Sequence, residues 1–469
     1  MNRKSHMTPD SPRAVAGEIV ARLQQAGFAA FWVGGCVRDF LLGREPQDFD
    51  IATDAKPEQV EKLFSKTIPV GKKFGVMIVV ENNQQFQVAT FRAEADYRDG
   101  RRPTKIAFAN AEADALRRDF TVNGLFYNPG TQKIHDWVGG EKDLRAKIIR
   151  TIGVPEDRFG EDHLRMLRAV RFAAQLNFEI EPETFAAIQR LAPKIKLISA
   201  ERIRDELLKL FSPDKVGQSS SLSMNRQDAC PTIAARGLVL LRDSGLLEHI
   251  LPELAATVAC EQSPDFHPEG SVFNHICLML EKLPPDANEL LPWTVLLHDI
   301  AKPVTAEHDL KTGAIHFYGH EKVGAEMAEK ILQRLRFPKK QTEEIVTCVR
   351  NHMQFKDVKQ MRKATLRRLL LRETFPLELE LHRLDCLGSS GGLEHYHFLR
   401  EQAEELKHQP TIRPPLLTGN DLIELGMKPG PVLGALLNEI REKQLADELK
   451  TPREAKAWVK KKLTAKNSG

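Results

Sequence analysis

Cysteines are few in this sequence, and long apolar runs are missing from it. Its 469 residues include six cysteines, which are scattered and form no CxxC pair. That pattern favours reduced thiols over a disulfide framework or a zinc knuckle. No run of about 18 apolar residues occurs, and no apolar signal-peptide core follows the first residues. We therefore expect a cytoplasmic protein that does not cross a membrane.

A strong excess of one charge is also missing. The formal net charge is only +4, and the hydrophobic (42%) and charged (28%) fractions are those of ordinary globular proteins, which excludes wholesale disorder. Basic residues do cluster locally, at 97–105, at 360–372 and near residue 460. Such clusters suit a phosphate backbone, but a solvated helix face produces them too. Composition alone therefore neither requires nor excludes a nucleic-acid partner.

The chain is long enough for several domains, and its periodicity changes near residue 150. Before this point short β-branched segments alternate with helical ones, which predicts a small mixed sheet with helices. After it helical periodicity dominates, with two breaks rich in serine or proline. We predict a head at 12–150, a helical neck at 151–211, a Ser-rich loop or insertion at 212–233, a helical body at 234–407 and a helical tail at 408–469.

The stretch GGCVRDFLLGREPQDFDIAT combines features suited to phosphate chemistry. If DFDIAT is a strand, Asp48 and Asp50 point to one face about 7 Å apart. Such carboxylates can converge on two divalent cations about 3.5 to 4 Å apart, the arrangement of two-metal phosphoryl transfer. Gly34 and Gly35 precede a helix that carries Arg38, so backbone amides can approach a phosphate closely. Asp-x-Asp alone is usually a solvated strand edge, and only the combination favours a phosphoryl-transfer site.

The whole stretch closely resembles the signature of the class II nucleotidyltransferase family, which comprises CCA-adding tRNA nucleotidyltransferases and bacterial poly(A) polymerases. The resemblance implies an α+β fold: a polymerase-β-like head with a small mixed sheet, followed by an all-α neck, body and tail. It also implies that Asp48 and Asp50 are catalytic ligands of Mg²⁺. Gly34, Gly35 and Arg38 would then bind the triphosphate of CTP or ATP.

The stretch RRDFTVNGLFY, residues 117–127, resembles the family's second motif. Asp119 and Asn123 are four residues apart and would share one face of a helix. A capped, salt-bridged helix would show the same residues. The resemblance implies that Arg118, Asp119 and Asn123 contact the ribose and phosphates. Gly124 stands where the family more often has alanine, and in a helix this would cost about 1 kcal/mol.

A third stretch, RFGEDHLRMLRAVRFAAQL, resembles the family's protein template for base selection. If it is helical, Asp162 and Arg165 are neighbours that offer acceptors and donors to the Watson-Crick edge of cytosine or adenine, whereas guanine and uracil present the opposite pattern. Glu161 is placed to brace Arg165. An ordinary ion-paired amphipathic helix would look similar. The resemblance implies that Glu161, Asp162, Arg165 and Arg168 bind the nucleotide.

Two features between these motifs concern the same site. Glycine, proline and several arginines at 94–104 predict a mobile basic loop, and in the resembling enzymes a flexible loop here helps the site switch from CTP to ATP. We therefore take Glu94 to Thr104 as the candidate switch. Gln87 lies on the neighbouring strand, where polymerase-β-like sites commonly carry a third carboxylate.

Histidines and aspartates recur at element ends in the helical part. An adjacent His-Asp pair after apolar residues, with a histidine upstream and an aspartate downstream, resembles the HD superfamily of metal-dependent phosphohydrolases. A lone histidine is usually a core or surface residue, but several at matching positions favour a metal site. The resemblance implies a second divalent or transition metal and hydrolysis of 2′ or 2′,3′-cyclic phosphates. Its ligands would be His275, His298, Asp299, His320, His352 and Asp385.

The leading functional hypothesis is template-independent addition of C, C and A to the 3′ end of tRNA, with CTP, ATP and Mg²⁺. In the tail, Pro429, Gly430 and Pro431 would form a turn before an RNA-binding helix, although a plain helix connection would look alike. We expect no membrane and no obligate protein partner.

Other functions stay open at this point. An A-only or CC-only transferase and a poly(A) polymerase share the same motifs, although Phe74 followed by Gly75 looks more like the CCA-adding branch. A catalytically idle RNA-binding protein, or an HD enzyme whose head only docks RNA, would keep the scaffold. The intact Asp48 and Asp50 count against an idle head.

Overall fold

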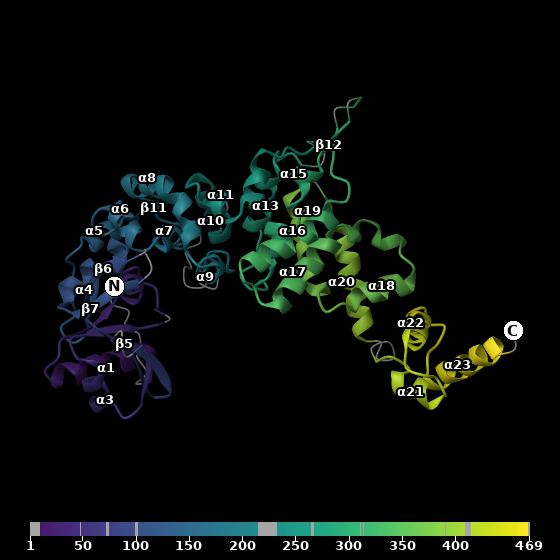
Figure 1. Cartoon of the computed structure of the whole chain (residues 1–469), viewed down its shortest axis with the longest axis horizontal. Coiled ribbons are helices and arrows are strands. Elements are labelled where there is room, and N and C mark those ends of the chain that lie inside the picture. The colour runs from purple at the N-terminus through teal and green to yellow at the C-terminus, as the bar shows by residue number, and fades with distance from the viewer. Residues whose placement is uncertain are drawn as a thin grey trace, which may run out of the picture. The chain divides into compact units, whose positions relative to one another are not determined.

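The structure is a computed structural model that describes residues 10–46, 48–71, 75–98, 102–213, 232–263, 267–309, 311–312, 314–389, 391–408 and 414–467. The chain divides into two compact units, Met1–Ala255 and Ala256–Gly469 (Figure 1). The finer division into neck, insertion, body and tail stays a prediction. Most of the expected insertion (214–231), the tip of the expected switch (99–101) and Phe74 lie outside the described residues.

A seven-stranded mixed sheet forms the head, in the order β3-β4-β5-β2-β1-β8-β9, and it confirms the small mixed sheet expected from the sequence. The central strands β1 and β2 pair antiparallel, whereas β2 and β5 pair parallel with Gln87 opposite Asp50. The strands are β1 (Ala30–Val33), β2 (Asp50–Thr53), β3 (Thr67–Gly71), β4 (Val76–Glu81), β5 (Gln84–Thr90), β8 (Phe126–Asn128) and β9 (Lys133–His135).

Helices cover this sheet and continue beyond it within the first unit (Figure 1). The short strands β10 (Ile148–Ile149) and β11 (Glu179–Ile180) pair parallel beside them. The helices are α1 (Pro12–Gln25), α2 (Gly35–Leu41), α3 (Pro57–Leu63), α4 (Ala111–Leu116), α5 (Gly140–Ala146), α6 (Pro155–Glu161), α7 (Leu164–Leu176), α8 (Pro182–Leu191), α9 (Ala200–Leu210), α10 (Ile233–Asp243), α11 (Leu246–Ile250) and α12 (Pro252–Ala255), with 3-10 turns η2 (Thr121–Asn123) and η3 (Ala192–Leu197).

Phe49 orients the two aspartates beside it. Its ring is 4% exposed and packs edge-on against Trp32 of β1, with ring centroids 4.9 Å apart. Burial of such a ring stabilises the fold by about 1.5–3 kcal/mol, so the inward orientation of Phe49 is strongly favoured. Asp48 and Asp50 are exposed, and they therefore face away from the core that Phe49 enters.

The helix predicted through Asp119 and Asn123 is wrong. α4 ends at Leu116, and the chain then forms a bend and the single 3-10 turn η2. The cause is Phe120, which is fully buried, has an extended backbone and forms a β-bridge with Thr151. Asp119 and Asn123 still meet, because Nδ2 of Asn123 donates to Oδ1 of Asp119 at 3.3 Å.

Gly124 therefore weakens no α-helix, which corrects the cost expected from the sequence. It follows η2 directly, and a Cβ at this position would lie 2.6 Å from Cγ2 of Val138 and 3.2 Å from Cδ1 of Ile152. A side chain at this position would therefore require these two neighbours to shift.

The third motif is also interrupted. α6 ends at Glu161, Asp162 is extended (φ −153°, ψ 105°), and α7 begins at Leu164. Oδ1 of Asp162 accepts the backbone N–H of Leu164 at 3.1 Å, as capping side chains do. Asp162 thus lies at a break between two helices and not within one helix as predicted.

The expected basic loop is a β-hairpin in its described part. β6 (Arg92–Arg98) pairs antiparallel with β7 (Arg102–Phe108), and Tyr97 lies opposite Pro103. Proline has no N–H to donate to a neighbouring strand. Both strands of a two-stranded ribbon are edge strands, where proline is tolerated.

Helices dominate the described part of the second unit, which also contains the short hairpin of β12 (Glu307–His308) and β13 (Ile315–His316). α16 and α17 pack against each other, and α13 packs on α14 and α19 (Figure 1). Its helices are α13 (Val272–Glu281), α14 (Leu291–Leu297), α15 (Lys302–Thr305), α16 (His320–Arg334), α17 (Lys339–Asn351), α18 (Lys363–Leu370), α19 (Phe375–Gly388), α20 (Glu394–Lys407), α21 (Gly419–Glu424), α22 (Pro431–Leu445) and α23 (Pro452–Asn467), with 3-10 segments η5 (Ala256–Ala259) and η6 (His352–Gln360).

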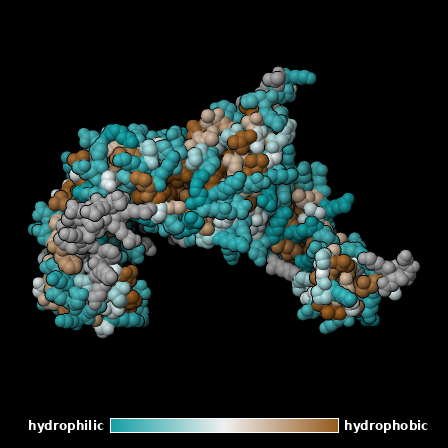
Figure 2. All heavy atoms as spheres, viewed as in Figure 1, coloured by the Kyte–Doolittle hydropathy of each residue, from teal (hydrophilic) through white to brown (hydrophobic). Residues whose placement is uncertain are grey.

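The last three helices have a small core of their own, which includes Leu422, Ile440 and Val459. α22 begins at Pro431 directly after Gly430, so the expected turn before a helix is present. In the face drawn in Figure 2, hydrophilic residues dominate both units and hydrophobic ones form scattered patches. Among the described residues, no helix combines the length and apolar character needed to cross a bilayer.

Gly140 provides a test of how tightly the η2 turn is packed. A Cβ on Gly140 would lie 2.2 Å from the carbonyl oxygen of Thr121, so Gly140→Ala should lower the free energy of unfolding by about 1–3 kcal/mol. The matched change Gly160→Ala, on an exposed helical position with nothing within 4 Å, should raise it by up to about 1 kcal/mol. Urea unfolding followed by circular dichroism measures both, and equal effects of the two changes would contradict this packing.

Candidate functional site

A polar hollow of about 790 Å³ in the first unit brings distant parts of the sequence together. Every head residue that the motifs pointed to lines it, except Glu161. The lining includes Gly34, Gly35, Arg38, Asp48, Asp50, Arg118, Asp119, Asn123, Asp162, Arg165 and Arg168.

The two acidic side chains share one wall of this hollow. Asp50 is the first residue of β2, whereas Asp48 lies on a bend just before the strand, which corrects the prediction that both are strand residues. Desolvation raises the pKa of Asp50, Arg118 opposes the rise, and the Asp48 carboxylate adds to it. Two neighbouring carboxylates are a suitable set of ligands for a divalent cation, because the cation removes their repulsion.

Gln87 faces the same wall from β5, directly opposite Asp50. Its amide oxygen is a neutral ligand of the kind that Mg²⁺ and Ca²⁺ accept. The strand position where a third carboxylate would be sought therefore carries an uncharged group.

A chain of polar contacts connects α2 with α7 through the η2 turn. Nη1 of Arg38 donates to Oδ1 of Asn123 at 2.8 Å, and Asn123 donates to Asp119. Arg168 donates to Oδ2 of Asp119 from Nε at 2.8 Å and from Nη2 at 2.6 Å. Burial alone would raise the pKa of Asp119, but the Arg168 guanidinium outweighs burial and holds this pKa at about 2. Asp119 is therefore a fixed anion.

Gly34 allows the closest approach on this wall. Its φ is +73°, a left-handed value that favours glycine, and a Cβ would lie 2.8 Å from Nη1 of Arg118. Arg118 in turn donates from Nη2 to Oδ2 of Asp114 at 3.1 Å, and its buried Nε has no hydrogen-bond partner. The arginine is thus held against the β1–α2 turn.

Asp162 and Arg165 are held from both sides. Nη2 of Arg202 donates to Oδ2 of Asp162 at 2.6 Å. The expected ion pair between Glu161 and Arg165 is present, and Arg165 also donates to the carbonyl oxygens of Arg158 (3.1 Å) and Arg117 (3.3 Å). Both side chains are therefore pre-positioned without a ligand.

Sequence reasoning missed several basic residues of this wall. Arg171 on α7 and Arg202 on α9 line the hollow, and Glu206 balances Arg171 with an oxygen 2.6 Å from Nε. Arg202 lies 40 residues from Asp162 in an unremarkable amphipathic helix, so no motif signalled it. Eight arginines and one lysine line the hollow against four aspartates, which suits a polyanion. The basic residues are Arg38, Arg92, Arg117, Arg118, Arg165, Arg168, Arg171, Arg202 and Lys209.

In the second unit, all six residues predicted for the HD-like site converge. Oδ1 of Asp299 lies 3.4 Å from Nε2 of His320 and 3.7 Å from Nε2 of His352, and Oδ2 lies 3.1 Å from Nε2 of His298. Nε2 of His275 lies 3.1 Å from Oδ1 of Asp385. These ligands come from α13, the end of α14, α16, the end of α17 and α19.

The chemistry of this cluster fits a cation. Ligand atoms of His275, His298 and Asp299 lie within 4.8 Å of one another, as do those of Asp299, His320 and His352. The buried Nε2 of His298 faces the Asp299 carboxylate. Burial lowers the pKa of His352 to about 4, which leaves a neutral imidazole able to ligate. Burial also opposes ionisation of Asp299, but the charges of His298 and Lys302 outweigh it and hold the pKa of Asp299 well below its usual range.

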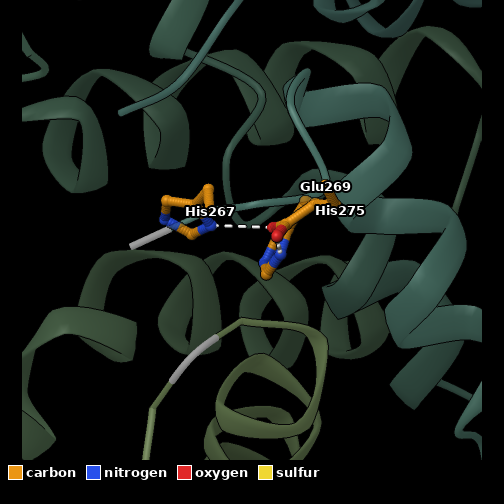
Figure 3. A group of neighbouring side chains, drawn as sticks. All are labelled: His267, Glu269 and His275. Atoms are coloured by element: carbon orange, nitrogen blue, oxygen red, sulfur yellow. Dashed lines mark hydrogen bonds and ion pairs between the residues drawn. The ribbon is translucent and has the colours of Figure 1, made fainter. Parts of the chain in front are cut away.

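Two further groups of this cluster were not found from the sequence. Lys302 donates from Nζ to Oδ2 of Asp299 at 2.7 Å and to Oε1 of Gln262 at 2.6 Å. Glu269 accepts from His267 and His275, each at 2.8 Å (Figure 3). Both could have been sought within a few residues of the HD motif, but spacing alone does not separate them from surface charges.

Comparison with known proteins agrees with both sites. Residues 30–150 match the family described as poly A polymerase head domain, residues 177–220 the one described as probable RNA and SrmB-binding site of polymerase A, and residues 271–387 the HD domain family. A crystal structure of the Bacillus stearothermophilus CCA-adding enzyme in complex with CTP covers 98% of this chain and 100% of its own, with 26% identity and a TM-score of 0.69.

In sequence and in fold, the chain is thus similar to CCA-adding enzymes.

Relatives in sequence cover only part of this chain. A CCA-adding enzyme of Staphylococcus aureus is 46% identical over 205 residues, which are 44% of this chain and 51% of that protein. The chain thus spans about half the length of the curated relatives it matches. A Thermotoga maritima CCA-adding enzyme complexed with tRNA shares the fold, with a TM-score of 0.55 and 18% identity over 97% of this chain and 96% of that one. Together these matches confirm the expected polymerase-β-like head.

The bond between Asp119 and Arg168 should matter for stability as well as for the site. Asp119→Ala removes two charge-assisted hydrogen bonds and leaves Arg168 without that anion, so the free energy of unfolding should fall by about 2–3 kcal/mol. Glu156→Ala, which removes a surface partner of Arg190, should cost clearly less, because both side chains are exposed to solvent. Chemical denaturation at pH 7 measures both, and similar small losses would show that the Asp119 contact is not structural.

Proposed function

We propose that the head adds C, C and A to the 3′ end of tRNA, using CTP and ATP. The observation that carries this proposal is the hollow, in which two exposed carboxylates face a wall of arginines beside a fixed carboxylate-guanidinium pair at Asp162 and Arg165. The names of the relatives support it, because the S. aureus protein and the B. stearothermophilus structure are both CCA-adding enzymes.

The residues present fit a pair of divalent cations, because Asp48, Asp50 and the Gln87 amide all face the hollow. Such cations, with Mg²⁺ as the proposed ion, would supply a lowered pKa for the attacking hydroxyl and neutralise the leaving pyrophosphate. In the reaction, the 3′-oxygen of tRNA forms a bond to the α-phosphorus and the bond between the α-phosphorus and the bridging oxygen breaks.

The arginine wall would hold the triphosphate in line for this attack. Arg38, Arg118 and Arg168 are each fixed by a contact inside the protein, so little side-chain entropy is lost when they bind phosphate. Because Gly34 has no side chain, the backbone N–H groups beside it can approach the phosphate oxygens closely.

Asp162 and Arg165 would select the base. An amino group at C4 of cytosine or C6 of adenine donates to the carboxylate, and the adjacent ring nitrogen accepts from the guanidinium. Uracil and guanine place an acceptor against the carboxylate and a donor against the guanidinium, so they are rejected. Glu161 and Arg202 hold the pair in place, which makes the selection a property of the empty site.

Replacing both acids should abolish transfer. Asp48→Ala with Asp50→Ala should reduce incorporation of labelled CTP and ATP into tRNA that lacks its CCA end by at least about 10³-fold, because the charges that hold the cations are gone. Binding of the same tRNA should persist. Glu45→Ala, an exposed acid of the same segment, serves as the matched control and should keep full activity.

The same assay separates the alternatives when CTP and ATP are supplied singly and together. CTP alone should give two additions, and ATP should then add one. Processive addition of ATP alone would assign a poly(A) polymerase, whereas incorporation of only C or only A would assign a partial transferase. Binding without any incorporation would leave an RNA-binding head and refute the proposal.

A second activity is favoured by the buried cluster of the second unit. We propose that it holds a divalent or transition-metal ion and hydrolyses 2′ or 2′,3′-cyclic phosphates at RNA ends. The observation that supports a metal is the convergence of the buried Nε2 atoms of His298, His320 and His352 on the Asp299 carboxylate. When bound, such an ion would activate a water molecule for attack on phosphorus.

Asp299→Asn should remove this activity and leave the other. Hydrolysis of 2′,3′-cyclic AMP, measured with Mg²⁺, Mn²⁺, Ni²⁺ or Zn²⁺, should fall by at least about 100-fold, because the carboxylate that touches three histidines loses its charge. Chelation should silence the wild type in the same way. CTP incorporation in the same preparation reports correct folding, and undiminished hydrolysis by the variant would refute a metal site here.

A further inference from the structure

The histidines of the buried cluster are oriented in two different ways. In three of them Nδ1 lies within hydrogen-bond distance of the backbone carbonyl three residues earlier, with distances of 2.8 Å for His298 to Val295, 2.7 Å for His320 to Phe317 and 2.7 Å for His352 to Val349. A carbonyl oxygen only accepts, so Nδ1 carries the proton and Nε2 is left to ligate. In all three, Nε2 is the nitrogen that approaches Asp299.

His275, which lies inside α13, shows a different arrangement. Its Nδ1 instead meets Oε1 of Glu269 at 2.8 Å and, more weakly, the carbonyl oxygen of Gly388 at 3.3 Å. Its Nε2 points the other way, to Asp385 at 3.1 Å. Glu269 therefore supplies through a side chain what the other three rings obtain from the backbone.

Glu269 is itself held in position. Its side chain is only 6% exposed, and it belongs to a turn in which the N–H of Gly270 donates to the carbonyl of His267 at 3.1 Å. Gly270 has φ +91°, and the bridge between Glu261 and Ser271 anchors the chain that follows. His267 donates to the same Oε1 at 2.8 Å, so the carboxylate is clamped between two imidazoles (Figure 3).

We propose that Glu269 is a positioning residue of this site: its carboxylate holds the proton of His275 on Nδ1 and so aims the Nε2 lone pair at the ion. This inference rests on the metal site proposed above. A carboxylate behind a ligating histidine also makes the imidazole more basic, and losing such a partner typically weakens metal binding by about 10- to 100-fold.

The competing interpretation is that His267, Glu269 and His275 hold an ion themselves, since their ligand atoms lie within 4.8 Å of one another. Two observations count against it. Nδ1 of His275 faces two acceptors, Glu269 and the carbonyl of Gly388, which requires a proton on that nitrogen. Gly388 also confines the ring, because a Cβ there would lie 3.2 Å from Cε1 of His275.

The test is a titration with Co²⁺ in full-length protein that carries Asp48→Asn and Asp50→Asn, so that the head does not contribute to binding. Calorimetry gives the dissociation constant, and the visible absorption of Co²⁺ reports its ligand geometry. Glu269→Gln should weaken binding by about 10- to 100-fold, because the amide can donate to Nδ1 and favour the wrong tautomer. Glu269→Asp withdraws the carboxylate by one carbon and should show the same direction of change, which covers the case that the Gln variant does not fold.

His267→Ala is the matched control, because it removes the other partner of Oε1 but no ligand of the proposed ion. It should change affinity by less than about fivefold, the factor that a partly exposed ion pair contributes. A loss equal to that of Glu269→Gln would show that the trio itself binds the ion and would overturn the positioning role. Unchanged affinity in folded Glu269→Gln or Glu269→Asp would overturn it as well. Absence of Co²⁺ binding in the parent, or binding that is no weaker after Asp299→Asn, would instead overturn the metal site on which the role rests.

Discussion

The contact between Asp119 and Arg168 is the constraint on which the head depends. Asp119 follows α4 in the part of the chain that carries the sheet, and Arg168 belongs to α7, the helix that also carries Arg165. Through this pair, Asp48 and Asp50 acquire a defined separation from the residues proposed to select the base. The alternation of charge continues to Glu206, so each buried ion has an opposite neighbour and the cost of desolvation is offset.

Local pattern predicted what depends on local forces. An apolar residue between two acids predicts their common outward face, and the burial of Phe49 agrees. The six HD-like residues could be collected from the sequence because apolar segments place each of them at a helix end or on a helix face. The mixed sheet followed from strand-length, β-branched segments between turn residues.

Contacts between residues far apart in the sequence account for the differences between the expected and the observed helices. The helical pattern around Phe120 is continuous, but a bridge to Thr151 thirty-one positions away extends the backbone there. Helical periodicity also runs unbroken through Asp162, whose bond to Arg202 comes from a distant helix. Arg202 itself had no motif to mark it. A search for arginines on the helices next to a predicted acidic pair would be the way to find such residues.

The histidines of the buried cluster differ in how sensitive their orientation is to substitutions nearby, because three of them bond to main-chain carbonyls. A carbonyl oxygen survives every side-chain replacement, so genetic drift around His298, His320 and His352 leaves their hydrogen-bond acceptors in place. Of the four, His275 alone has a side chain, Glu269, as the nearer acceptor of its Nδ1, and the carbonyl oxygen of Gly388 lies farther away. Substitution of Glu269 can therefore change the orientation of His275 without replacing any of the proposed ligands.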